Sequence, residues 1–368
     1  MTALRPDDDL RTDARVRRLR PGTRGEVRPL AVAPMMDRTD RFFRRMFRAI
    51  SRRTLLYTEM ITTGAVLHGD RDRLLGFDPI ERPLALQLGG DDPDALARCA
   101  EIAEARGFDE VDLNVGCPSE RVQRGRFGAC LMAEPERVAR AVAAMRSACG
   151  LPVTVKHRIG IDERDSWDEL LAFVDTVAEA GCDRFIVHAR KAWLSGLSPA
   201  DNRSIPPLRP DLVRRLARAR PGLAIEYNGG VRSLDDVLDH LQHVTSVMVG
   251  RAAWDDPFRF GAADRLLWGE TGPLPTRRRV LETFREFARE QAARGTRPVA
   301  LVRPLTGLAR GCPGGRRFRR VLGEAVARGG DPVRAIDLAA AALPAEILDC
   351  PPPAPRPPVP AGASGDPS

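Results

Sequence analysis

The sequence predicts an α/β fold: a (β/α)8 TIM barrel followed by a small C-terminal helical-bundle domain. Eight short apolar runs of strand length lie between residues 30 and 250, and most precede a segment with helical spacing. Eight such units in about 240 residues match the size of a (β/α)8 barrel. A doubly wound sheet is the alternative, but Pro34-Met35-Met36 follows the first run where that fold carries a glycine fingerprint.

The expected strands span residues 30–33, 55–59, 84–88, 111–115, 153–156, 185–188, 224–228 and 246–250. Capping signals mark several helices between them. Residues 92–106 begin with Asp-Asp-Pro, and residues 134–149 have Pro135 near their start and Gly150 after their end. Residues 165–180 end at Gly181, and residues 233–240 open with Ser-Leu-Asp-Asp.

Changes in composition divide the chain into four parts. Residues 1–27 are charged and lack a period, which predicts a flexible N-terminal extension. Residues 28–268 form the expected barrel, and residues 269–348 form the expected helical domain. Its helical stretches are 276–294, 299–310, 314–328 and 331–348. Residues 349–368 are rich in Pro and Ala and are expected to be disordered.

Charge and cysteine usage narrow the functional classes. The net charge is +8 and the isoelectric point is about 9.6, which points to an anionic partner. Residues 271–330 hold 14 arginines and four glutamates, so the excess of positive charge gathers there. The seven cysteines form no CxxC pair, which argues against zinc and disulfides and fits a cytoplasmic protein. No apolar run reaches the ~18 residues of a membrane helix.

The carboxyl ends of barrel strands converge on one face, so polar residues there are candidates for a site. Residues 111–118 alternate as a strand and then turn at Gly116 and Pro118, which presents Cys117 just past the strand end. Asn114 on the same stretch is one of only three asparagines. A small buried structural cysteine is the alternative interpretation of Cys117.

Glycines after the seventh and eighth strands predict a phosphate site, because backbone N–H groups approach a ligand closely where there is no Cβ. They occur in Asn228-Gly229-Gly230 and in Gly250-Arg251, where Arg251 can add a bidentate contact.

Four other strand ends suit a ring system. Lys156 fits a ring edge that gains negative charge, His188 fits a ring or a phosphate, and Gln87 fits an amide-like edge. Pro34-Met35-Met36 offers an apolar floor. This inventory predicts FMN.

A thiol beside a reduced flavin has a natural role as a proton donor. A neutral thiol, with a reference pKa of ~8.5, can release a proton near pH 7. A nucleophilic thiolate is the rival role and needs a paired base. His157 is left out of the site because Lys156 and Arg158 share the opposite face of their strand, and His68 is unassigned.

The motifs at these strand ends resemble those of the tRNA-dihydrouridine synthases. The similar stretches are 33–35, 56–60, 86–90, 114–118, 155–156, 188–190, 228–230 and 249–251, within a match over about 28–330. Residues 188–198, 202–203 and 314–320 resemble the DusA branch. Pro304 and Ala200 depart from the family pattern.

The resemblance implies an FMN enzyme that uses NADPH to reduce uridine to 5,6-dihydrouridine in the D-loop of tRNA, at U20 and U20a. Cys117 would be the proton donor and Asn114 a uracil contact. The implied FMN residues are Pro34, Met35, Met36, Gln87, Lys156, His188, Asn228, Gly229, Gly230, Gly250 and Arg251. The implied tRNA contacts are Arg203, Arg316 and Arg319, and Arg158 and Arg190 join them from their strand ends.

Two other functions stay open on the sequence. An FMN-dependent barrel oxidoreductase could act on a free pyrimidine or another small metabolite, but it would have no use for a basic helical domain. A non-catalytic RNA-binding protein would have no use for Cys117 and a phosphate site.

Overall fold

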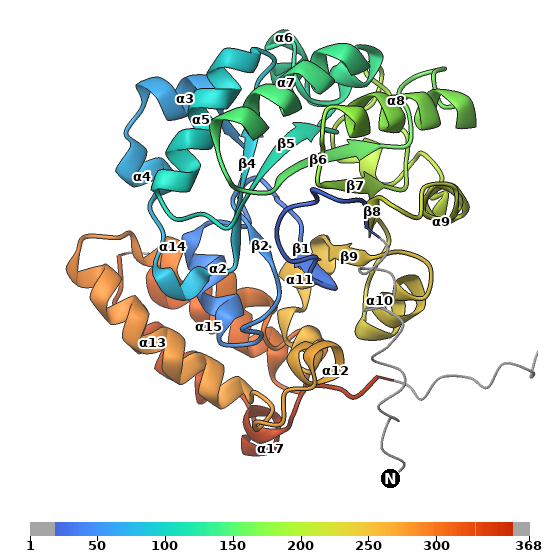
Figure 1. Ribbon diagram of the computed structural model, residues 1–368. Helices are drawn as coiled ribbons and strands as arrows, with labels where there is room; N and C mark the ends of the chain where they lie inside the picture. Colours follow the sequence, from blue (N-terminus) through green and yellow to red (C-terminus); the bar gives the residue numbers. More distant parts are fainter. Residues whose placement is uncertain (1–18, 328, 356–368) are drawn as a thin grey trace, which may run out of the picture.

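The computed structural model describes residues 19–327 and 329–355, and its central feature is a closed parallel sheet (Figure 1). The strand order is β1-β9-β8-β7-β6-β5-β4-β2, and a bridge between Ala31 and Leu55 joins the two ends of that order. The predicted barrel is therefore confirmed. Its strands are β1 (Leu30–Val32), β2 (Leu56–Tyr57), β4 (Leu84–Gly89), β5 (Glu110–Val115), β6 (Val153–Arg158), β7 (Arg184–His188), β8 (Ala224–Asn228) and β9 (Ser246–Val249).

All eight expected strands are present, and their bounds shift by at most two residues. The sequence did not indicate β3 (Ile61–Thr62), which pairs with β4 at Leu88 and Gly89. This strand has only two residues, too few to show an alternating pattern.

Helices cover the outside of the barrel, with their caps where the sequence places them. Asp92 accepts a hydrogen bond from the N–H of Asp94, and Ser233 accepts one from Asp236. Ser166 and Glu169 form a reciprocal capping box. The helices are α2 (Arg41–Arg48), α3 (Thr63–His68), α4 (Arg71–Leu75), α5 (Pro93–Ala105), α6 (Glu120–Arg124), α7 (Pro135–Ala148), α8 (Trp167–Glu179), α9 (Pro210–Ala219), α10 (Leu234–Leu241), α11 (Arg251–Asp255) and α12 (Ala263–Trp268).

The inside of the barrel holds a buried network of charged side chains. Arg184 donates to Glu110 at 2.5 Å and lies 2.7 Å from Glu226. The hydroxyl of Tyr57 also donates to Glu110, at 2.8 Å. All four side chains are buried, so the middle of the barrel depends on paired charges as well as on apolar packing.

In the part of the chain after the barrel that the structure describes, five α-helices pack against the side that carries α2 (Figure 1). Phe287 meets Phe42 with ring centroids 6.3 Å apart, and Phe284 and Phe318 belong to the same apolar core as the barrel helices. The apolar side chains of the expected helical domain are thus buried in a core that is continuous with that of the barrel. The helices are α13 (Arg277–Ala293), α14 (Pro298–Val302), α15 (Gly315–Val326), α16 (Pro332–Ala340) and α17 (Ala345–Asp349).

The ends of the described chain contact the barrel, which differs from the expected flexible extension and tail. Arg24 donates through its backbone N–H to Asp183 at 2.8 Å and through its guanidinium to the carbonyl of Cys149 at 2.7 Å. Near the other end, Pro352 is buried. The remaining parts of both predictions, residues 1–18 and 356–368, lie outside the described residues. In the described part of the chain, no helix is long and apolar enough to cross a membrane.

Candidate active site

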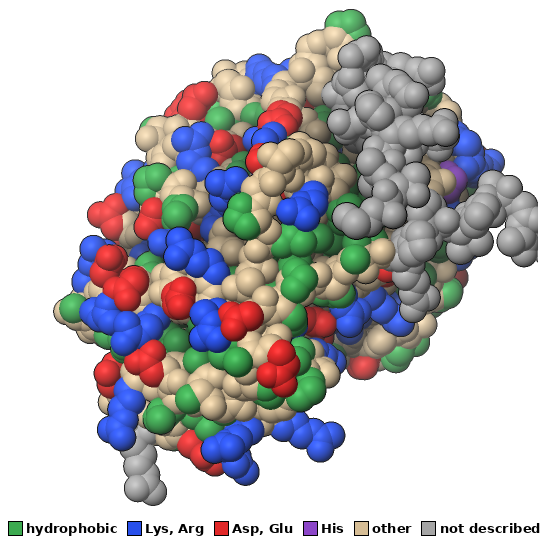
Figure 2. Space-filling model, turned by 90° about the horizontal axis from the view of Figure 1, so that it is seen from below, with side chains coloured by type: hydrophobic (Ala, Val, Ile, Leu, Met, Phe, Trp, Pro, Cys, Tyr) green, Lys and Arg blue, Asp and Glu red, His purple; other side chains and the backbone are tan. Residues whose placement is uncertain are grey.

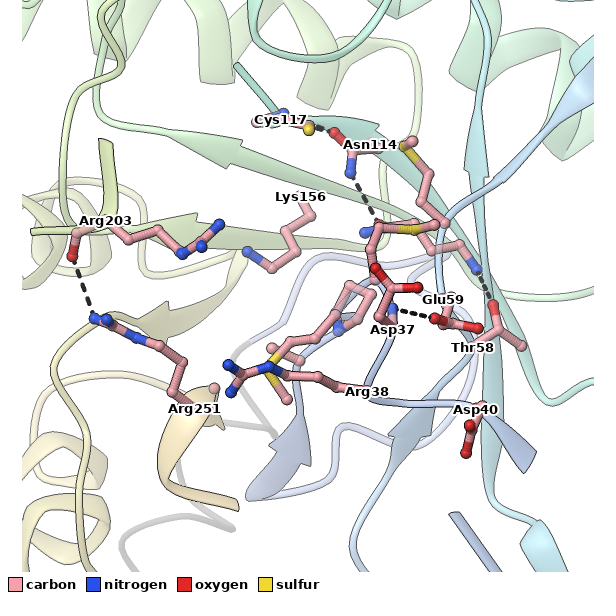
Figure 3. A pocket seen from close by; sticks show the side chains of 18 of the residues that line it. Asp37, Arg38, Asp40, Thr58, Glu59, Asn114, Cys117, Lys156, Arg203 and Arg251 are labelled. Atoms are coloured by element: carbon pink, nitrogen blue, oxygen red, sulfur yellow. Dashed lines mark hydrogen bonds between the residues drawn. The ribbon is translucent and has the colours of Figure 1, made fainter. Parts of the chain in front are cut away.

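A large cavity of about 1570 Å³ opens at the carboxyl ends of the strands (Figure 3). Sixteen of the eighteen residues proposed from the sequence line it, and the two others are Arg316 and Arg319. The sixteen are Pro34, Met35, Met36, Gln87, Asn114, Cys117, Lys156, Arg158, His188, Arg190, Arg203, Asn228, Gly229, Gly230, Gly250 and Arg251.

The lining of the cavity is strongly basic. It holds twelve arginines and one lysine against five acidic residues. Low-dielectric walls that carry one sign of charge concentrate oppositely charged ligands, so the cavity suits an anion. The arginines are Arg38, Arg41, Arg44, Arg73, Arg121, Arg158, Arg190, Arg203, Arg232, Arg251, Arg259 and Arg310.

The turn after β5 holds Cys117 at the edge of the cavity. The side-chain oxygen of Asn114 accepts hydrogen bonds from the N–H groups of Gly116 at 3.1 Å and Cys117 at 3.0 Å. The carbonyl of Cys117 accepts a further bond from Ala129 at 2.9 Å. The thiol is half-buried and donates to the hydroxyl of Ser119 at 3.5 Å. The backbone of this turn is therefore fixed, and its sulfur borders the cavity.

Lys156 projects toward the middle of the cavity from β6 (Figure 3). Its ammonium donates to the side-chain oxygen of Asn228 at 3.0 Å, and the amide nitrogen of Asn228 donates to the carbonyl of Met248 at 2.8 Å. Burial lowers the pKa of Lys156, and the nearby carboxylate of Asp112 opposes that shift. In this structure, the side chain of Asn228 therefore orients the ammonium group of Lys156.

His188 and two glycine turns face the same space. Burial and the neighbouring cations Arg158 and Lys156 hold the pKa of His188 well below its usual value. Its Nδ1 is buried and has no hydrogen-bond partner among the described residues. Gly229 and Gly230 have φ angles of +121° and +72°, a backbone conformation that residues with a side chain rarely adopt.

The surroundings of Gly250 leave room for a ligand. A Cβ built at this position would meet nothing within 4 Å, so the backbone borders open space. Arg251 beside it is exposed, and its guanidinium lies 3.3 Å from the carbonyl of Arg203 (Figure 3). Together with the unpartnered Nδ1 of His188, these groups fit one phosphate and one ring with polar edges.

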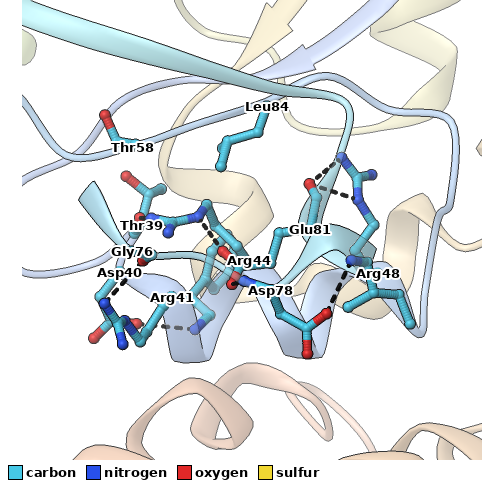
Figure 4. Close-up of polar contacts among 12 residues, drawn as sticks. Thr39, Asp40, Arg41, Arg44, Arg48, Thr58, Gly76, Asp78, Glu81 and Leu84 are labelled. Carbon is cyan, nitrogen blue, oxygen red and sulfur yellow. Dashed lines mark hydrogen bonds and ion pairs between the residues drawn. The ribbon is translucent and has the colours of Figure 1, made fainter. Parts of the chain in front are cut away.

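The loop after β1 forms another wall and is held from beneath by α2 (Figure 4). The N–H of Met35 donates to the hydroxyl of Thr39 at 3.0 Å. Arg44 donates to the carbonyl of Thr39 at 2.8 Å and to Glu81 at 2.7 Å. Met35 packs against the core, whereas Met36 is 56% exposed, so the expected apolar floor comes mainly from Met35.

The arginines proposed as tRNA contacts differ in their surroundings. Arg158 is buried and donates to the carbonyls of Gly116 at 3.0 Å, Lys191 at 3.0 Å and Asn202 at 2.9 Å. Arg158 thus ties the Cys117 turn to the loop after β7. Arg190 is half-buried and donates to the carbonyl of Pro206, while Arg203 is exposed on that loop.

Arg316 and Arg319 lie on α15, are exposed, and are absent from the cavity lining. Other arginines of the helical region are paired, as Arg278 is with Asp349 and Arg285 with Asp337, each at 2.6 Å. Figure 2 accordingly shows basic and acidic side chains interspersed on the face that it presents. The acidic partners Asp337 and Asp349 belong to α16 and α17, which follow residues 271–330 in the sequence. They partly compensate the positive charge of residues 271–330.

Two acidic side chains lie at or under the cavity, the half-buried Glu59 and the fully buried Asp112. Glu59 accepts from the N–H of Asp37, and burial raises the pKa of its carboxyl group. Asp112 lies under the cavity and is fully buried. Sequence reasoning missed Asp112, although the strand pattern could have identified it. Residues two positions apart in a strand point to the same face, which places Asp112 on the face of Asn114.

Comparisons with known proteins agree with this geometry. The profile of the dihydrouridine synthase (Dus) family matches residues 31–343. A Synechocystis protein described as tRNA-dihydrouridine(20/20a) synthase is 54% identical over 298 residues, which is 81% of this chain and 89% of the relative. Proteins with the same description from Shewanella oneidensis and Pseudomonas syringae are each 51% identical, over 85% and 86% of this chain and 93% and 94% of the relatives.

Proposed function

The chain belongs to the dihydrouridine synthase family, and we propose that it reduces uridine to 5,6-dihydrouridine at positions 20 and 20a of the tRNA D-loop, with FMN as cofactor and NADPH as reductant. The relatives' shared description supports the substrate and positions. The observation that carries the proposal is the cavity itself, which brings a thiol, a lysine and glycine turns together within basic walls.

FMN fits the groups that this chain provides. Gly229, Gly230 and Gly250 with Arg251 would hold the phosphate, and the unpartnered Nδ1 of His188 would bond to the cofactor. Lys156 would face the ring edge that gains negative charge. Bound FMN supplies hydride transfer from NADPH to the C=C bond of the uracil ring.

The residues around the substrate complete the reduction. We assign Cys117 as the group that gives its thiol proton to the uracil carbon that does not receive the hydride. Asn114 would contact the uracil, and Arg158 would hold the turn through the carbonyl of Gly116. Arg190 and Arg203 would neutralise nearby phosphates at the mouth of the cavity.

A loss of the Lys156 charge is expected to weaken FMN binding. The purified protein should be yellow, Lys156→Ala should lose FMN more readily, and Lys156→Arg should retain more of it because it keeps a cation at that place. Flavin absorbance after gel filtration and titration of the apoprotein with FMN measure both effects. A colourless protein that FMN cannot reconstitute would contradict the cofactor assignment.

Arg316→Ala with Arg319→Ala is expected to weaken tRNA binding without changing flavin reduction. The two residues lie three apart on α15 and so share one face. Each lost phosphate contact should flatten the log–log salt dependence of binding by up to ~1 unit. Binding isotherms at several salt concentrations measure the slope.

Arg98→Ala with Arg140→Ala is the matched control, since these exposed residues lie on α5 and α7 of the barrel. It removes the same charge at a distance from α15 in sequence and in the fold. If the α15 double variant and the unmodified protein have equal tRNA affinity and equal salt slope, Arg316 and Arg319 do not contact tRNA.

A further inference from the structure

A chain of hydrogen bonds runs under the Cys117 turn and ends on a buried carboxylate. Asp112 accepts from the side-chain nitrogen of Gln87 at 2.7 Å, and the oxygen of Gln87 accepts from the side-chain nitrogen of Asn114 at 2.9 Å. The oxygen of Asn114 then accepts from the backbone N–H groups of the turn, including that of Cys117 at 3.0 Å. Three adjacent side chains thus connect the barrel interior to the backbone that carries the thiol.

The carboxylate determines the direction of this chain. An amide side chain can present either its oxygen or its nitrogen to a neighbour, whereas an ionised carboxylate only accepts. Burial raises the pKa of Asp112 to about 7, and the hydrogen bonds from Gln87 and Thr154 oppose that shift by favouring the ionised, accepting form. Asp112 therefore requires the nitrogen of Gln87, which leaves the oxygen of Gln87 for Asn114. Asn114 must then turn its own oxygen toward the N–H groups of Gly116 and Cys117.

Burial makes this orientation important. Asp112 is 0% exposed, Gln87 1% and Asn114 9%, so water has little access to replace a lost bond. An unpaired buried polar group costs about 1–3 kcal/mol. The second oxygen of Asp112 is also satisfied, because Thr154 donates its hydroxyl to it at 2.9 Å. The carboxylate is held on both sides and cannot rotate without breaking a bond.

We propose that Asp112 is a positioning residue for proton transfer: through Gln87 and Asn114 it fixes the backbone turn that presents the Cys117 thiol to the substrate. The proposal rests on the function assigned to Cys117 above. Asp112 itself is fully buried and does not line the cavity.

Two substitutions of Asp112 separate the effect of its hydrogen bonds from the effect of its charge. Asp112→Asn can offer its oxygen to Gln87 and its nitrogen to the hydroxyl of Thr154, so it keeps the chain of bonds and removes the charge. Asp112→Leu removes both. If Asp112→Leu does not fold, Asp112→Ser takes its place, since its side chain is too short for the direct bond to Gln87.

The FMN-loaded variants are reduced with NADPH and then mixed with tRNA in a single turnover. Asp112→Asn is expected to stay within about threefold of the unmodified rate, and the Leu or Ser variant to be about tenfold slower or more, with KM for tRNA and the rate of flavin reduction little changed. Equal single-turnover rates in all variants, or an Asn variant as slow as the others, would overturn the proposal.

Alkylation of Cys117 by iodoacetamide, followed by peptide mass spectrometry, gives a readout that needs no activity. The thiol should react several-fold faster in the Leu or Ser variant, because the turn is no longer held, and at the unmodified rate in Asp112→Asn. Equal alkylation rates in all variants would overturn the proposal. An unmodified protein that does not reduce tRNA would contradict the proposed function alone, and alkylation would still test the role of Asp112.

Discussion

Replacing Cys117 by alanine is expected to slow tRNA reduction by ~10²–10⁴-fold, the usual range for loss of general acid catalysis. Flavin reduction by NADPH should be unchanged, because the thiol enters only when the uracil carbon needs a proton. The turn should keep its shape, since Asn114 holds it through backbone N–H groups that alanine retains. Stopped-flow measurement of each half-reaction separates the two steps.

Cys130→Ala is the matched control for this experiment. Cys130 is also half-buried, and its thiol donates to the carbonyl of Phe127 rather than bordering the cavity. This variant should reduce tRNA at the unmodified rate. Full-rate single-turnover reduction of tRNA by the Cys117→Ala protein would show that another group supplies the proton.

Arg184→Met is expected to destabilise the folded protein by ~3–5 kcal/mol, the cost of removing one partner from a buried ion pair. Arg184 lies between Glu110 and Glu226 inside the barrel, and all three are buried. Without the arginine, the two buried carboxylates lose the cation that pairs with both of them. Urea unfolding of the FMN-loaded protein measures the loss.

A combined variant tests whether the carboxylates cause that loss. Arg184→Met with Glu110→Gln and Glu226→Gln removes the stranded charges and should recover much of the stability, because neutral replacements for buried ionic groups are often tolerated. A loss below ~1 kcal/mol for Arg184→Met alone would mean that this network contributes no more than a surface ion pair.

The fold and most of the site could be predicted because they depend on local patterns. Apolar runs of strand length reveal the strands, and closure of a parallel barrel brings the strand ends to one face. Once the strands are located, residues as distant as Pro34 and Arg251 must line the same cavity, as they do. No knowledge of their individual contacts is needed for this inference.

What the sequence could not predict depends on contacts between distant segments. Arg158 occupies a strand end, which suggested a tRNA contact, but its bonds to Gly116, Lys191 and Asn202 depend on how two loops fold over it. The pairing of Arg278 with Asp349 likewise joins residues 71 positions apart. Side-chain partners of this kind leave no periodic signal in the sequence.

The most direct test of the proposed function is reduction of an unmodified tRNA transcript by the FMN-loaded protein with NADPH, with the product mapped by nuclease digestion and mass spectrometry. The D-loop fragment that contains positions 20 and 20a should gain two hydrogen atoms for each uridine reduced. Other fragments should keep their mass, and free uracil should not be reduced. Reduction of free uracil with no change in the tRNA would contradict the proposal and favour a metabolite oxidoreductase.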